Sequence, residues 1–127
     1  MAEQLNRTVA DVSVDALIYG DNPRPDTFAV TVASGQGKLT RGTVLSLNGN
    51  GKAVIMGTND GAQSPTTYAA NCILCKDVDA TSSDAVAIAY RQGHFAKDQL
   101  IVKEGYTLTA SDIDTLRTHN IVVSERL

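Results

Sequence analysis

Alternating apolar and polar positions dominate the middle of the chain and predict β-strands. Phe28, Val30 and Val32 alternate with Thr and Ala, a period of two that suits a half-buried strand. Residues 48–51, Asn-Gly-Asn-Gly, form a strong hairpin turn signal. Short strands separated by Gly and Asn predict a small barrel or bent ribbon. The further apolar runs that we expect as strands are residues 44–47, 52–56, 68–76, 85–90, 100–102 and 121–123.

One short helix is predicted near the C-terminus. Thr109 can cap it, and Asp112, three residues later, completes a pair that resembles a capping box. Ile113 and Leu116 fall on one helical face, and Asn120 can end the helix in the left-handed conformation. A helix this short is not stable alone, so we expect it to pack on the sheet. The fold class is therefore mainly β with one short helix.

The first 26 residues show dispersed apolar positions without a sustained period. Residues 20–26 hold two of the three prolines, which remove backbone donors and favour extended conformations. Residues 1–26 are either an arm joined to the body by this stiff segment, or an ordinary first strand pair with a proline-rich loop. The sequence leaves both interpretations open.

Composition and charge narrow the classes of function. With 127 residues, 43% of them hydrophobic, the chain is long enough for one domain with its own core. Eleven basic and fourteen acidic side chains give a net charge of −3, without a basic stripe, so we expect no nucleic-acid partner. Charges interrupt every apolar run before a membrane span could form, so we expect no membrane partner. The first residues show no signal peptide, and we expect synthesis in a reducing cytoplasm.

The C-x-x-C motif of Cys72 and Cys75 is the strongest candidate for chemistry. In redox enzymes this motif lies at the start of a helix, whereas here it lies in an apparent strand, where residues three apart point to opposite faces. A zinc site would need two more ligands, and His94 and His119 do not form a second paired motif. We therefore interpret both cysteines as small buried hydrophobes and both histidines as structural or solvent-facing.

The remaining motifs are better explained as turns. Gly37-Lys38 and Gly51-Lys52 lack the Ser or Thr that follows Lys in a phosphate-binding loop. Asp77, Asp79 and Asp84 lack the Gly and Glu of a calcium loop. We expect no catalytic residues, no metal and no cofactor, and hence no enzyme.

Several segments in order resemble the bacteriophage head decoration protein family, whose best-known member is the lambda-type decoration protein D. The similarity covers roughly residues 27–127, and its weight comes from the order and spacing of short pieces. These pieces are residues 40–45 (Thr-Arg-Gly-Thr-Val-Leu), 77–81 (Asp-Val-Asp-Ala-Thr), 84–88 (Asp-Ala-Val-Ala-Ile), 93–95 (Gly-His-Phe), 100–102 (Leu-Ile-Val), 116–117 (Leu-Arg) and 121–123 (Ile-Val-Val).

The resemblance implies a non-enzymatic protein with a β-clip-like fold. Family members form trimers on the outer surface of the expanded capsid, where they clamp subunits of the major capsid protein against the pressure of packaged DNA. Their N-terminal arm makes much of the capsid contact, often as a strand added to the shell protein. This chain departs from the family by a longer and more apolar N-terminal portion.

On this basis we expect residues 1–33 to be an extended capsid-binding arm and residues 34–127 to be the β-rich body, located on the virion. The predicted capsid contacts are Val9, Val12, Val14, Phe28, Val30 and Val32, and the predicted trimer contacts are Val86, Ile88 and Leu100. Extended segments bind by adding a strand to a sheet, which suits this alternation. Two other classes stay open: a cellular β-barrel module that binds a peptide or saccharide, and a thiol-dependent enzyme.

Overall fold

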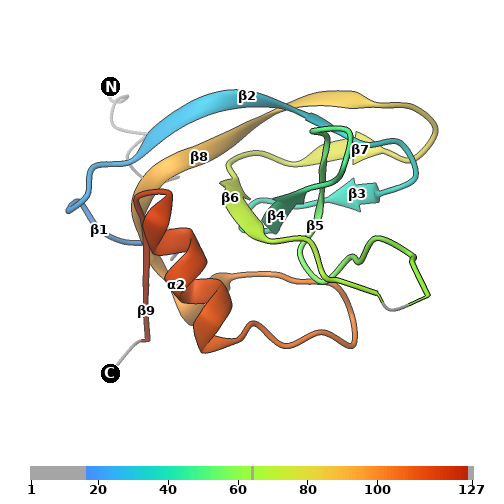
Figure 1. The fold of residues 1–127 in the computed structure, drawn as a ribbon. Coiled ribbons are helices and arrows are strands. Elements are labelled where there is room, and N and C mark those ends of the chain that lie inside the picture. The colour runs from blue at the N-terminus through green and yellow to red at the C-terminus, as the bar shows by residue number, and fades with distance from the viewer. Residues whose placement is uncertain (1–16, 64, 126–127) are drawn as a thin grey trace, which may run out of the picture.

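The computed structural model describes residues 17–63 and 65–125. It confirms the prediction of a mainly β protein with a small barrel-like body, and it shows one α-helix in the part described (Figure 1). The elements in chain order are β1 (Ile18–Gly20), β2 (Asp26–Val32), β3 (Gly37–Leu39), β4 (Val44–Leu47), β5 (Ala53–Ile55), β6 (Ala70–Leu74), β7 (Val78–Ala80), β8 (Ala85–Ala96), the 3-10 turn η1 (Lys97–Gln99), α2 (Ala110–Thr118) and β9 (Ile121–Ser124).

Five strands close into a ring around the core. β8 pairs antiparallel with β2 and with β6, β6 pairs with β4, and β4 pairs with β5. β5 returns to β2 through one parallel pairing, Ala53 with Val32. The ring encloses aliphatic side chains and few aromatic ones, as the composition requires. Its largest fully buried members include Leu45, Met56, Ile73, Leu74, Val32 and Val44.

β8 continues beyond the ring and carries the two terminal strands. Its second half pairs antiparallel with β1 and parallel with β9. A Cβ atom on Gly93 would lie 2.7 Å from the ring of Phe95, so only glycine fits where that ring folds back under the strand. Phe95 is fully buried there. α2 packs against β9 and β6, beside this half of β8 (Figure 1).

The predicted helix and its cap are confirmed. The Asp112 N–H donates to the Thr109 hydroxyl (3.1 Å), and the Asp112 carboxylate accepts the Thr109 N–H (3.0 Å). The same carboxylate accepts the hydroxyl of Tyr106, which ties the preceding loop to the helix start. Leu116 is the fully buried contact of the helix, and Asn120 ends it with a φ of 65°.

Two local predictions are wrong. Residues 100–102 form an isolated bridge between Ile101 and Thr43 instead of a strand, because only one residue of the run comes into register with its neighbour. Conversely, β3 and β7 pair with each other inside segments predicted as turns. Each of these strands has three residues, which is too short for an alternating pattern to show in the sequence.

The structure places residues 17–33 in the body and not in an arm. β1 and β2 both lie along β8, joined by the proline-containing residues 21–25. Within this stretch β1 and β2 do not pair with each other; each pairs with β8, and the proline-containing loop joins them. The stretch belongs to the body because the alternating apolar side chains of β2 complete the core, with Val32 fully buried. Residues 1–16 of the predicted arm lie outside the described residues.

The join between β2 and β5 is the weakest seam of the ring. Besides their one paired position, the Ala33 N–H donates to the Ala53 carbonyl (2.9 Å). The N–H of Ile55 lies beyond the single β2–β5 pairing and donates to the side-chain Oε1 of Gln36 (2.8 Å). A side chain thus replaces a backbone acceptor where the two strands diverge.

Removing this acceptor should loosen the seam. Gln36→Ala leaves the half-buried Ile55 N–H without its partner, and we expect a loss of about 1 kcal/mol in the free energy of unfolding. Gln36→Glu retains an oxygen at the same reach and should stay close to wild type. Urea denaturation of the three proteins checks this. Equal stability of Gln36→Ala and wild type would show that the seam does not depend on this bond.

Candidate functional site

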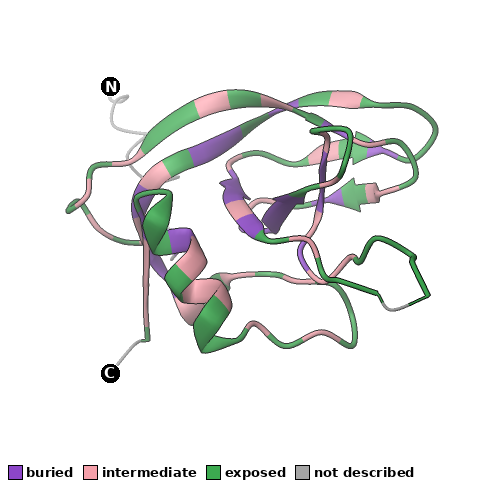
Figure 2. Cartoon of the chain, viewed as in Figure 1, coloured by how far each residue is buried: buried purple, intermediate pink, exposed green. Residues whose placement is uncertain are grey.

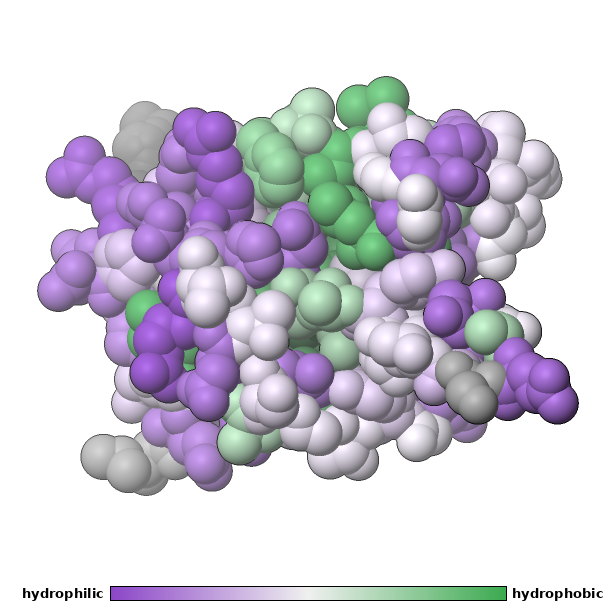
Figure 3. All heavy atoms as spheres, viewed as in Figure 1, coloured by the Kyte–Doolittle hydropathy of each residue, from purple (hydrophilic) through white to green (hydrophobic). Residues whose placement is uncertain are grey.

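The outer face of the β2–β8 ribbon carries the most exposed large hydrophobic residues of the ring. Val86 is 73% exposed and Ile88 is 38% exposed. Both lie on β8, directly opposite the exposed residues Thr31 and Ala29 of β2. Figure 2 shows exposed positions alternating with intermediate ones along β2 and with buried ones along the first half of β8. Figure 3 shows hydrophobic residues gathered at the top of the molecule, where these strands run. We call Val86, Ile88, Ala29 and Thr31 the outer patch.

The inner face of the same ribbon holds three predicted capsid contacts, Phe28, Val30 and Val32. They lie opposite three alanines of β8 and pack against the core, with Val32 fully buried. Because small alanines leave room above β8, the larger side chains of β2 fill it. Val32 is enclosed in the body, whereas Phe28 and Val30 pack against the core and stay partly exposed. The other predicted capsid contacts, Val9, Val12 and Val14, lie outside the described residues.

Leu100, predicted as a trimer contact, is not part of the outer patch. It follows η1, past the opposite end of β8 from Val86, and is half-buried. Together with Val102, Tyr106 and Leu108 it lines a hollow of about 240 Å³. The structure therefore brings Val86 and Ile88 together and leaves Leu100 apart from them.

A polar cluster forms around Tyr90, two residues after Ile88 on β8. Arg41 donates from Nη1 to the Tyr90 hydroxyl (2.7 Å) and to the Cys75 carbonyl (3.0 Å). Its guanidinium also lies 5.4 Å from the centre of the Tyr90 ring, a cation–π contact. Burial raises the pKa of Tyr90. Sequence reasoning missed this cluster because its members come from three separate segments and match no spacing pattern.

The two cysteines differ in environment, and both are free thiols. Cys72 is fully buried in β6, and burial raises the pKa of its thiol to about 12. Cys75 follows the end of β6 and is half-buried, with Sγ 3.8 Å from Nη1 of Arg41. The prediction that they do not form a redox pair agrees with this arrangement, whereas full burial holds for Cys72 alone.

Thiol chemistry should separate the two positions. We expect a thiol reagent such as DTNB to modify Cys75 in the folded protein and Cys72 only after unfolding, since the thiolate is the reactive form. Absorbance at neutral pH with and without urea measures this, with Cys75→Ser and Cys72→Ser as matched variants. Rapid reaction of native Cys75→Ser would contradict the buried assignment of Cys72.

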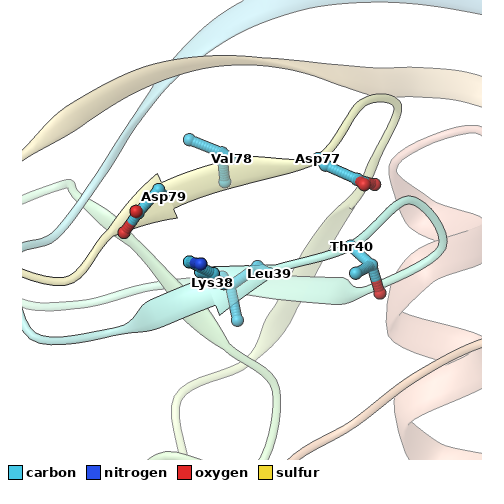
Figure 4. A pocket seen from close by; sticks show the side chains of 6 residues that line it. All are labelled: Lys38, Leu39, Thr40, Asp77, Val78 and Asp79. Carbon is cyan, nitrogen blue, oxygen red and sulfur yellow. The ribbon is translucent and has the colours of Figure 1, made fainter.

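The hollow between β3 and β7 is a surface depression of about 330 Å³ (Figure 4). Lys38 lies opposite Asp79 at one end, and Thr40 lies near Asp77 at the other (Figure 4). Both carboxylates accept hydrogen bonds. Asp77 accepts the N–H of Arg41, which lies far away in the sequence (2.9 Å), while hydrogen bonds from the neighbouring Thr81 lower the pKa of Asp79. These hydrogen bonds stabilise the β3–β7 pair, and the positive charge of Lys38 also lowers the pKa of Asp79.

The histidines have structural neighbours. His94 Nε2 lies 2.7 Å from the Ser124 hydroxyl of β9, and its ring packs edge-on against Tyr19 of β1, with 5.1 Å between centroids. It thereby joins the two terminal strands. His119 closes α2.

Residues 17–63 and 65–125 contain no group of three or more side chains suited to hold a metal ion. No helix in these ranges is long and apolar enough to cross a membrane.

Comparison with known proteins found one family model that matches the chain. The family model described as bacteriophage lambda head decoration protein D matches residues 8–121, most of the chain. A search of curated proteins found no match. Of the three classes of function that the sequence left open, this finding favours the structural head protein.

Proposed function

Because the chain belongs to the bacteriophage lambda head decoration protein D family, we propose that it binds the outer surface of the expanded head as a trimer and stabilises the shell of major capsid protein against DNA pressure. The observation that carries this proposal is the family match over residues 8–121. The protein is then a structural, non-catalytic component of the virion that is made in the host cytoplasm.

The physical character of the chain supports an exterior position. A net charge of −3 would be unfavourable beside packaged DNA but costs nothing on the outside of the shell. Four of the exposed charged groups are engaged in ion pairs within the ribbon region, Lys52 with Asp84 and Arg91 with Asp26. Hydrogen bonds and charge from these partners lower the pKa of both aspartates.

We assign the capsid contacts of the arm to residues before Leu17. With β2 occupied in the body, Val9, Val12 and Val14 are the apolar positions left from the predicted set. The alternation of Val12 with Val14 suits an extended segment that adds to an edge of the shell protein, where backbone bonds supply affinity and alternate side chains supply specificity.

Charges at these positions should weaken decoration without unfolding the body. Val12→Asp combined with Val14→Asp should lower the affinity for expanded shells by about tenfold or more, because two apolar contacts are lost. Ser13→Asp, which adds a charge at the intervening polar position, is the matched control. Co-sedimentation with shells measures binding, and thermal melting checks the fold. Unchanged affinity of the double variant would remove the arm from the proposal.

We assign the trimer contact to Val86 and Ile88 of the outer patch, since Val86 is the most exposed large hydrophobic residue described. Burial of such side chains against a second copy is favourable and requires no rearrangement of the ring.

Val86→Asp should therefore abolish self-association while leaving the melting temperature of the monomer unchanged. Ser83→Asp, an exposed position in the preceding loop, adds the same charge outside the patch. Analytical ultracentrifugation, together with chemical cross-linking on decorated shells, detects the trimer. A Val86→Asp protein that still forms trimers would place the interface elsewhere.

A further inference from the structure

The open edge of β2 is a second feature of the ribbon that the proposed function does not use. β2 pairs with β8 over its whole length on one side. On the other side, among the described residues, it pairs with β5 only at Val32. Residues 26–31 therefore present a strand edge without a neighbouring strand in the described part of the chain.

The hydrogen-bond directions show which groups this edge offers. The Ala33 N–H points toward β5, and the groups of Ile88 point toward β6, since its carbonyl accepts the Cys75 N–H (2.9 Å). Because backbone groups alternate sides along a strand, Ala29, opposite Ile88, and Thr31 turn their N–H groups to the open edge. The Thr27 N–H faces the same way but is engaged by the Asp26 carboxylate.

This edge lacks the usual protection against pairing. Natural edge strands carry Lys, Pro, bulges or inward charges that block an added strand. From Thr27 to Ala33 the sequence reads Thr-Phe-Ala-Val-Thr-Val-Ala, without a charge or a proline. The register shift between Asp26 and Thr27 lies at the far end of this stretch. The stretch itself is regular and uncharged, which favours pairing with another extended chain.

We propose that the β2 edge binds an extended segment of the shell protein, which adds to the body as a further strand. This inference rests on the proposed function for the identity of the partner. A strand added there would lie about 4.8 Å from β2. Its outward side chains would pack beside Ala29 and continue the face of Val86 and Ile88, so small or apolar residues at alternate positions are expected.

The shell protein fits this edge better than a second copy does. Two β2 edges that pair with each other form an interface of the same surface on both partners. Such an interface closes a two-fold dimer, whereas the proposed function requires a trimer. The proposed capsid-binding arm also leads through β1 into β2, so both contacts with the shell protein would fall in neighbouring parts of the sequence. A shell segment along β2 thus continues the contact that the arm begins.

A proline at the edge tests the proposal. Ala29→Pro removes the N–H that points outward and leaves the β2–β8 bonds in place, and proline is tolerated on edge strands when its missing N–H faces away from the sheet. We expect the affinity of full-length Ala29→Pro for expanded shells to fall by about tenfold, since the added strand loses a backbone bond and meets the proline ring. Ala29→Ser keeps the N–H and should bind like wild type.

Hydrogen exchange tests the same edge in the unmodified protein. The amides of Ala29 and Thr31 should exchange rapidly in free protein and slowly on shells, while Val30 is protected in both. If Ala29→Pro binds shells like wild type, or if the edge amides stay unprotected on shells, the inference is overturned and the proposed function is not. A solution dimer abolished by Ala29→Pro would assign the edge to a second copy and overturn it too. If the wild-type protein does not bind expanded shells, the proposed function and this inference are both overturned.

Discussion

The pairing of β8 with four other strands is the constraint on which the rest of the structure depends. β2 and β6 flank its first half and close the ring, whereas β1 and β9 flank its second half. Its alternation places alanines inward, which leaves room for Phe28, Val30 and Val32 of β2, and places Val86 and Ile88 outward. Core, terminal strands and outer patch thus all follow from one twelve-residue strand.

A closed ring of strands with one exposed ribbon suits a structural protein that assembles with others. The two carboxylates at the hollow between β3 and β7 accept hydrogen bonds from backbone N–H groups, and burial raises the pKa of the Cys72 thiol to about 12. What the body offers to partners is a patch of aliphatic side chains and an uncharged strand edge. Both surfaces lie on β2 and β8, so contact with a second copy and contact with the shell would be mechanically coupled through the same two strands.

Sequence reasoning found the elements whose signals are local and missed those that depend on distant partners. The alternation at Phe28, the Asn-Gly turn and the Thr109 cap each encode their structure within a few residues. Which face of β2 lies toward the core cannot be seen within a few residues. It depends on the alanines of β8, about 57 residues later in the chain, since Val30 lies opposite Ala87. Arg41 meets Tyr90 for the same reason, through the closure of the ring.

The central claim is that this protein decorates the outside of a phage head, and electron microscopy of expanded capsids tests it most directly. Shells are compared after incubation with and without the full-length chain. The account predicts added density on the outer surface at the threefold positions, present only with the protein. Shells that are identical in both samples, or added density confined to the interior, would contradict it.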